Sequence, residues 1–174
     1  HELMADHLGR SGALDDLYCG VGLHGLDLAG NSALRGVEWS AESVRAADLN
    51  AEQRGACNSS QFRAASVEQA YPALTEQSRS PRVVLNPGRA GCRPQVLDAL
   101  VARRPDRLAY LSCNPHTLCR DLDHLVRGGF EIQGLRLGDV RLLGMEGEIF
   151  VRYQLDLPQA PPTILCGYAN GCVG

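Results

Sequence analysis

Hydrophobic and polar positions follow two different periods along this chain. Short apolar runs, each bounded by Gly, Pro, Asn or an acidic residue, predict buried strands. These predicted strands lie at residues 13–19, 33–39, 61–66, 81–86 and 107–113. Apolar residues spaced three or four apart predict helices at residues 41–55, 93–104 and 116–129. Strands that alternate with helices are typical of an α/β fold, with a mostly parallel sheet covered on both faces.

The last part of the chain departs from this alternation. Residues 131–140 and 148–157 predict two late strands, which we expect to form an antiparallel pair. From Pro158 onward the sequence PQAPPTILCGYANGCVG has no strand or helix period and predicts an irregular C-terminal tail, residues 158–174.

Length and charge bound the kind of protein. A chain of 174 residues is long enough for one domain with its own core. No apolar run approaches the roughly 18 residues that a membrane span needs, and the start HELMADHLGR lacks the layout of a signal peptide. The net charge is −3 and the pI about 5.9. If the chain acts on RNA, a local basic patch, another domain or a partner must therefore supply much of the phosphate affinity. The chain starts directly with structured sequence, as a fragment of a larger protein would.

The cysteines argue against a disulfide framework and against a zinc site. There are seven, an odd number, and none forms a CxxC pair. We therefore expect free thiols, no bound metal and a reducing cytoplasm.

The first predicted strand runs into the glycine-rich turn of residues 16–22, DLYCGVG. Gly20 and Gly22 would let a ligand approach the backbone, and Glu38, at the end of the second strand, lies where an acid accepts hydrogen bonds from ribose hydroxyls. With Gly25 the letters GxGxxG are present, but the resemblance to a dinucleotide-binding motif stops at the letters. An ordinary structural turn explains the same residues.

A cysteine stands at the exit of the fifth predicted strand, in LSCNPHTLCRDL. Pro115 cannot continue a strand and biases Asn114 away from helical geometry, so the chain must turn sharply at Cys113. The helix that follows points its amino end at the same place, which favours a thiolate. Cys113 is either a small core residue or a thiol held at the mouth of a pocket.

Four segments, in this order, resemble the catalytic domain of the S-adenosylmethionine-dependent RNA (uracil-5-)-methyltransferase family: DLYCGVG, GVEWSAESVRAADLNAEQRG, LNPGRAGCRPQVLDAL and YLSCNPHTLCRDL. The resemblance covers about residues 14–155, and the SCNPxTLxRDL stretch is its most distinctive part. It implies that residues 1–157 form a Rossmann-like class I methyltransferase domain. It also implies S-adenosylmethionine as cofactor, ribosomal or transfer RNA as substrate, and a cytoplasmic location.

The resemblance also implies a covalent mechanism. Carbon 5 of uracil is too poor a nucleophile to take a methyl group directly, and addition of a thiolate to carbon 6 activates it. Cys113 matches the family's nucleophile, whereas Cys19, Cys92 and Cys119 are read as structural. Glu148, nine residues after Asp139, matches the base that removes the proton from carbon 5. Glu146 is the fallback, and an ordinary exposed loop acid is the alternative reading of Glu148.

The remaining site residues follow from the same resemblance. The expected cofactor-binding residues are Asp16, Tyr18, Gly20, Gly22, Glu38, Ser66 and Asn86. The expected substrate-binding residues are Asn86, Arg89 and Arg120, with Arg93 as a further RNA contact.

The chain departs from the family in three places. Asn86 stands where the family has an aspartate at the target base, and an amide carries no charge. Ser66 replaces an aspartate that reaches toward adenine. The family's N-terminal RNA-binding parts are absent. Two hypotheses therefore stay open: an active methyltransferase domain, or a non-catalytic or weakly active cofactor- or RNA-binding module derived from that family.

Overall fold

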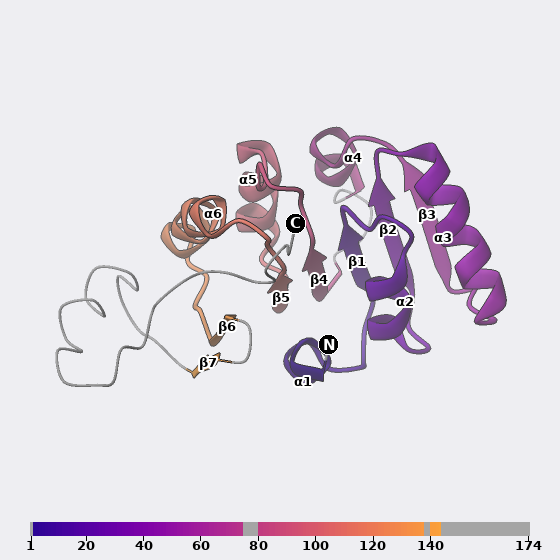
Figure 1. The fold of residues 1–174 in the computed structure, drawn as a ribbon, viewed down its shortest axis with the longest axis horizontal. Coiled ribbons are helices and arrows are strands. Elements are labelled where there is room, and N and C mark those ends of the chain that lie inside the picture. Colours follow the sequence, from indigo (N-terminus) through magenta and orange to yellow (C-terminus); the bar gives the residue numbers. More distant parts are fainter. Residues whose placement is uncertain (1, 75–79, 138–139, 144–174) are drawn as a thin grey trace, which may run out of the picture.

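A five-stranded parallel sheet forms the centre of the chain (Figure 1). The computed structural model describes residues 2–74, 80–137 and 140–143, with side chains within residues 4–74 and 80–135. The strands are β1 (Leu14–Leu17), β2 (Leu34–Glu38), β3 (Ser60–Ala64), β4 (Arg82–Leu85) and β5 (Arg107–Tyr110). Their order is β3-β2-β1-β4-β5, so the direction of winding reverses between β1 and β4. The predicted parallel α/β sheet is confirmed.

Helices cover both faces of this sheet (Figure 1). They are α1 (Glu2–Leu8), α2 (Leu23–Ala29), α3 (Ala41–Gln53), α4 (Val67–Leu74), α5 (Pro94–Arg103) and α6 (Pro115–Arg127). Residues of α1, α2 and α3 share one buried cluster with Leu14, Leu34 and Val84 of the sheet. Residues of α4, α5 and α6 share the other cluster with Leu17 and Val83. Because successive strand side chains point to opposite faces, β1, β2 and β4 each contribute buried residues to both cores.

The end of β1 shows why the predicted strands were too long. The prediction ran to residue 19, but β1 stops at Leu17 because Tyr18 adopts a left-handed backbone conformation, with φ 61°. Gly22, with φ 77°, then begins α2. This helix was not predicted, and neither were α1 and α4, since each spans only two turns and is too short for a clear apolar period. No helix among the described residues has both the length and the apolar character to cross a bilayer.

The late strands fit the prediction only partly. Strand β6 (Gly134–Leu137) lies within the predicted strand of residues 131–140. It pairs in antiparallel fashion with β7 (Val140–Leu143), so the observed partner is the segment that follows directly. The expected partner, residues 148–157, and the predicted tail, residues 158–174, lie outside the described residues.

Candidate active site

The carboxyl ends of the parallel strands bring the predicted site residues to one edge of the sheet. Tyr18 to Gly22 follow β1, Glu38 ends β2, Asn86 follows β4, and Cys113 follows β5. Strand β4 lies between β1 and β5. The glycine turn and the cysteine therefore flank the point at which the winding reverses, where open α/β sheets bind their ligands.

Glu38 fixes the glycine turn from the neighbouring strand. One carboxylate oxygen accepts the N–H of Gly20 at 3.2 Å, and the other accepts the N–H of Ser40 at 3.0 Å. The side chain is almost wholly buried, with 8% exposed. A carboxylate oxygen can accept more than one hydrogen bond, so Glu38 keeps capacity for a ligand's hydroxyl groups.

The three glycines of the turn do different things. A side chain at Gly20 would meet nothing within 4 Å, so this position borders open space. A Cβ at Gly22 would lie 2.9 Å from the ring of Phe62, and one at Gly25 would lie 2.6 Å from the carboxylate of Asp16. Gly22 and Gly25 are thus needed for close packing of α2 on the sheet, and Gly20 is the position that leaves room for a ligand.

Asp16 is a buried carboxylate beneath this turn. Its Oδ2 accepts the N–H of Gly25 at 2.9 Å, while Oδ1 has no hydrogen-bond partner among the described residues. Burial raises the pKa of Asp16 to about 7, the bond from Gly25 opposes this shift, and the charge of Glu38 adds to it. Near neutral pH this group is therefore divided between its charged and neutral forms.

Glu68, which the sequence did not single out, joins two of the predicted cofactor residues. The hydroxyl groups of Ser66 and Tyr18 donate to its carboxylate at 2.6 and 3.0 Å. Burial alone would raise the pKa of Glu68, but these hydrogen bonds and the charge of Arg93 hold the pKa below its usual value. The hydroxyl hydrogen of Ser66 is thus already used in the bond to Glu68. An acid does lie close to the position of Ser66, two residues later in the chain.

Trp39 is a second residue that sequence reasoning missed. It follows Glu38 directly, and 77% of its side chain is exposed. It is the only tryptophan of the chain and follows the acid at the end of β2, with its flat ring open to solvent.

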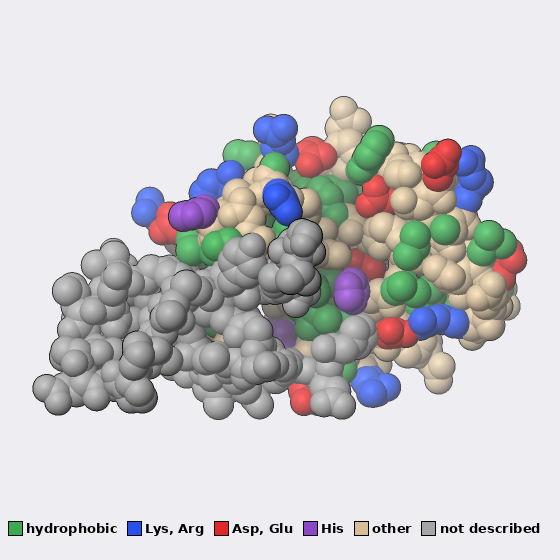
Figure 2. All heavy atoms as spheres, viewed as in Figure 1, with side chains coloured by type: hydrophobic (Ala, Val, Ile, Leu, Met, Phe, Trp, Pro, Cys, Tyr) green, Lys and Arg blue, Asp and Glu red, His purple; other side chains and the backbone are tan. Residues whose placement is uncertain are grey.

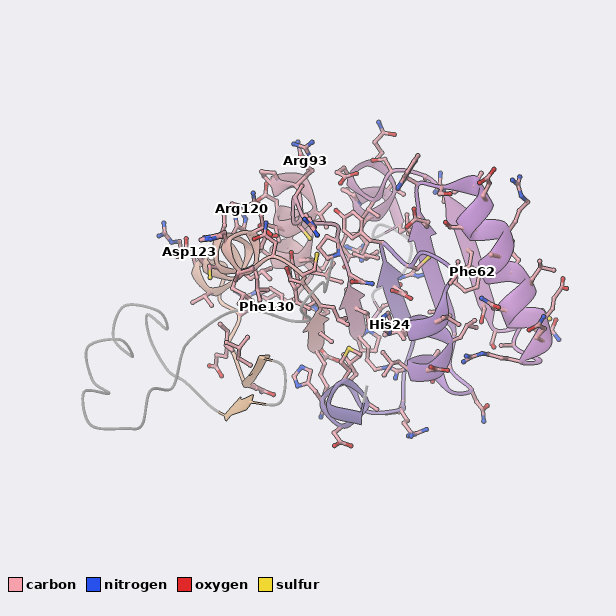
Figure 3. All side chains as sticks on the ribbon, viewed as in Figure 1. His24, Phe62, Arg93, Arg120, Asp123 and Phe130 are labelled. Carbon is pink, nitrogen blue, oxygen red and sulfur yellow. The ribbon has the colours of Figure 1, made fainter. Side chains whose placement is uncertain are left out.

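The loop after β4 carries Asn86 into solvent. The N–H of Asn86 donates to the carbonyl of Leu17 at 3.2 Å, which extends the pairing of β1 and β4 by one residue. Its side chain is exposed, as are those of Arg89 and Arg93 further along the same connection. Figure 3 shows Arg93 and Arg120 toward the carboxyl ends of the strands, and Figure 2 shows basic side chains gathered over α5 and α6.

Cys113 is exposed at the turn between β5 and α6. The N–H of Asn114 donates to Ser112 Oγ at 3.1 Å, and Ser112 Oγ donates to the Asn114 carbonyl at 3.0 Å, which closes a tight turn around the cysteine. Asn114 then caps α6 by accepting the N–H of His116 at 3.1 Å. The thiol therefore lies immediately before the amino end of a 13-residue helix.

The three cysteines that were read as structural fit that reading. Cys19 and Cys92 are buried, and burial raises the pKa of Cys92 to about 12, so its thiol stays protonated. Cys119 is half-buried on α6. All described cysteines are free, and the described His, Cys, Asp and Glu residues form no group that could hold a metal ion.

Comparison with known proteins decides the family. The sequence profile of tRNA (uracil-5-)-methyltransferases matches residues 4–139. The chain belongs to this family. An uncharacterized RNA methyltransferase of Oceanobacillus iheyensis is 37% identical over 136 residues, which is 77% of this chain and 29% of the relative. One from Gloeobacter violaceus is 42% identical over 126 residues, 72% of this chain and 26% of the relative.

Solved structures agree with this family. The tRNA (uracil-54, C5)-methyltransferase of Pyrococcus abyssi, in complex with S-adenosyl-L-homocysteine, is 26% identical with a TM-score of 0.62. The similar region spans 71% of this chain and 30% of the Pyrococcus abyssi chain. A precorrin 8W decarboxylase from Methanobacterium thermoautotrophicum, at 17% identity and a TM-score of 0.63, supports the fold alone. The chain thus spans less than a third of the length of the two RNA methyltransferases and of the Pyrococcus abyssi enzyme.

The family match ends before the expected base. Glu148, with Asp139 and the fallback Glu146, lies outside the described residues, and its role stays a prediction. The structure brings the other predicted residues of this uracil-5-methyltransferase family member to one edge of the sheet, at the carboxyl ends of the strands or on the loops that follow them. Arg120 comes there from α6, where its guanidinium contacts the loop after β4.

Proposed function

We propose that this chain methylates carbon 5 of uracil in RNA, with S-adenosylmethionine as methyl donor and Cys113 as covalent nucleophile. One observation carries the proposal above the others. An exposed thiol precedes the amino end of α6, at the same sheet edge as a glycine turn and a buried acid that suit a nucleoside. Family membership supports RNA as the substrate class, with ribosomal and transfer RNA as the two candidates.

The residues of the turn fit the cofactor. Gly20 leaves open space, Glu38 can accept ribose hydroxyl groups, and the orphaned Oδ1 of Asp16 can accept a donor such as an ammonium group. Tyr18, Gly22, Ser66 and Asn86 complete the proposed cofactor set. Trp39 would offer its ring to the base of the nucleoside. When bound, the cofactor supplies an electrophilic methyl group on a sulfonium.

Cys113 starts the proposed chemistry. The thiolate form of a cysteine is the nucleophile, and Cys113 is exposed and can reach a substrate. The sulfur adds to carbon 6 of uracil, and the electrons of the 5,6 double bond make carbon 5 nucleophilic. Carbon 5 then takes the methyl group, and S-adenosylhomocysteine is left.

A base must next restore the ring. Removal of the proton from carbon 5 re-forms the double bond and expels the Cys113 sulfur, which frees the methylated RNA. We propose Glu148 as this base, with Glu146 as the fallback. Asn86 would face the uracil and hold it through its amide, which offers a donor as well as an acceptor.

Arginines would provide the contacts to phosphate. All 17 basic residues of the chain are arginine, and Arg89, Arg93 and Arg120 are the ones we propose for RNA. Because the net charge is −3, we propose that a further domain or a partner supplies much of the RNA affinity. The length of the relatives leaves room for such a part.

Two observations favour a second candidate, a non-catalytic or weakly active cofactor- or RNA-binding module. Asn86 carries no negative charge at the position that we propose faces the uracil. The hydroxyl of Ser66 already donates to Glu68. The two functions differ in one property, namely whether Cys113 ever forms a covalent bond to the uracil.

Covalent trapping tests the proposal. The protein is incubated with S-adenosylmethionine and with tRNA or ribosomal RNA transcribed with 5-fluorouridine in place of uridine. Fluorine at carbon 5 cannot leave as a proton does, so an active enzyme stays attached to the RNA. We expect a stable adduct, mapped by mass spectrometry to Cys113. Cofactor binding without any adduct on either RNA would favour the non-catalytic module instead.

A further inference from the structure

Four polar residues around the start of α6 take no part in the bond-making and bond-breaking steps proposed above. They are Asn114, Thr117, Arg120 and Asp121. Their spacing of three and four residues places them on one side of the helix. All four contact the loop between β4 and α5, residues 86–93, and we call them the clasp.

The clasp binds the backbone of this loop at successive residues. Asn114 Nδ2 and Thr117 Oγ1 both donate to the carbonyl of Arg89, at 2.9 and 3.2 Å. Arg120 Nη2 donates to the carbonyls of Ala90 and Cys92, at 3.0 and 3.1 Å. These bonds link segments 25 to 30 residues apart in the chain.

Asp121 is the centre of the clasp. Its carboxylate is wholly buried, with 0% exposed. One oxygen accepts the N–H of Cys92 at 2.7 Å and the hydroxyl of Tyr110 at 2.5 Å. The other accepts both Nε and Nη2 of Arg120, at 2.9 and 2.7 Å. A buried charge is costly unless it is fully bonded, so this set of bonds specifies one arrangement of β5, α6 and the loop.

Gly91 shows how closely the clasp fits its loop. A Cβ at this position would lie 2.5 Å from the carboxylate of Asp121, 2.7 Å from Arg120 and 2.9 Å from Thr117. The backbone of Gly91 also has a φ of 72°, which other residues rarely adopt. The loop therefore lies directly on α6, with no space for a side chain between them.

The loop is also tied at its other end. The N–H of Asn86 donates to Leu17 of β1, so Asn86 is held by the sheet, while residues 89–92 are held by the helix that begins beside Cys113. One end of the loop is thus attached to the sheet and the other to α6, and both are rigid elements. Asn86 lies at the end of β4, and Cys113 lies just before the start of α6.

We propose that the clasp is a positioning device, which sets the place of Asn86 and its loop relative to Cys113 so that both meet the same uracil. This inference rests on the proposed function. It gives Arg120 a task through the loop, in addition to any contact with RNA. A displacement of about 1 Å between reacting groups can cost on the order of 100-fold in rate, so loss of the clasp should slow the covalent step.

Asp121→Asn tests this proposal in the full chain, by single-turnover adduct formation with 5-fluorouridine RNA. The change removes the charge that holds Arg120. We expect adduct formation at saturating RNA to become roughly 10- to 100-fold slower. The final amount of adduct should match the wild type, and RNA affinity, measured in a Cys113→Ala background, should change less than about twofold. The matched control is Asp123→Asn on the same helix, where an exposed aspartate pairs with Arg127 and lies on the outer side of α6 (Figure 3).

Thr117 gives a second test in case Asp121→Asn does not fold. Thr117→Ser keeps the hydroxyl that donates to Arg89 and should keep the wild-type rate, whereas Thr117→Val keeps the shape without the donor and should be slower. A purely structural role would lower the amount of active protein in both variants without changing the rate. That result, or equal rates for Ser and Val, would overturn the proposal.

Amide hydrogen exchange over residues 88–92 separates this proposal from the proposed function. If the wild type forms no adduct, the covalent mechanism fails, and the clasp is judged by exchange alone. Faster exchange in Asp121→Asn, but not in Asp123→Asn, supports the clasp as the element that holds the loop. Unchanged exchange in Asp121→Asn overturns it.

Discussion

The turn after β1 and the loop after β4 lie at the same edge of the sheet, but they are held in different ways. The turn is fixed by two buried acids from the strands themselves, Asp16 and Glu38, which bind backbone N–H groups. The loop is fixed by side chains of a later helix, α6, and of its N-cap Asn114, which bind carbonyls and one N–H group of the loop. The turn keeps its functional groups buried, whereas the loop and its neighbour expose Asn86 and Cys113.

This difference indicates a division of labour. A site for a small cofactor can be built within one strand–helix–strand unit, because its partners are close in sequence. A site for a large substrate must open outward, and its exposed groups then need support from elsewhere in the chain. The departure at Asn86 falls in the supported loop. The turn keeps its glycines and acids.

The largest expected effect is at the exposed side of this comparison. Cys113→Ala should reduce both methylation and the fluorouridine adduct to background, because no other described thiol lies at this sheet edge in an exposed position beside a helix terminus. Transfer of tritiated methyl groups to RNA measures the first, and gel retention under denaturing conditions measures the second. Cys57→Ala is the matched control, since Cys57 is also exposed but lies before β3. Methylation by Cys113→Ala would disprove the covalent mechanism.

Glu148→Gln should have the next largest effect. Loss of a general base typically costs roughly 100- to 10,000-fold in turnover. Because the methyl group is transferred before this base acts, a methylated RNA–protein species should accumulate with ordinary uridine RNA, and denaturing gels would detect it. Glu146→Gln serves as the comparison. If only the Glu146 variant accumulates this species, the fallback residue is the base.

The sequence predicted the central sheet well, because buried parallel strands are short apolar runs with clear ends. It placed Gly20, Glu38, Asn86 and Cys113 at the strand ends for the same reason. The periods could not show α2 and α4, since short helices give no repeated apolar pattern. α2 also depends on the left-handed φ of Gly22 and on close packing at Gly25, which appear only in three dimensions.

The sequence could not predict the clasp in the same way. The motif SCNPxTLxRDL marked Asn114, Thr117 and Asp121 as letters of a family, with no indication of their partners. Those partners are backbone groups of another loop. Every residue has a backbone carbonyl, so the sequence does not show which carbonyls accept these hydrogen bonds. Glu68 was missed because its link to Tyr18 spans 50 residues.

Glu38→Ala tests the turn and should have an intermediate effect. It removes the acceptor for Gly20 and the proposed acceptor for ribose hydroxyl groups. Hydrogen bonds to a charged group contribute about 1.5–3 kcal/mol, so cofactor affinity should fall roughly 10- to 100-fold. Calorimetry with S-adenosylhomocysteine measures this change. Glu42→Ala, at an exposed acid in the first turn of α3, is the control. Affinity that survives Glu38→Ala would place the cofactor elsewhere.

The smallest expected effect is a pH dependence at Asp16. Burial raises its pKa from 3.8 to about 7, so the folded protein without ligand binds this proton more tightly than the unfolded chain does. Stability contributed by the neutral form is thus complete below pH 3.8 and is lost as the pH rises toward 7. A cofactor group that donates to Asp16 favours the charged form instead. Affinity for S-adenosylhomocysteine should therefore rise by up to about tenfold between pH 6 and pH 8. The control is Asp16→Asn, which keeps an acceptor for Gly25 but cannot titrate. Any pH dependence that comes from titration of the ligand itself is still measured in this variant. An equal slope in both proteins would show that Asp16 does not contact the cofactor.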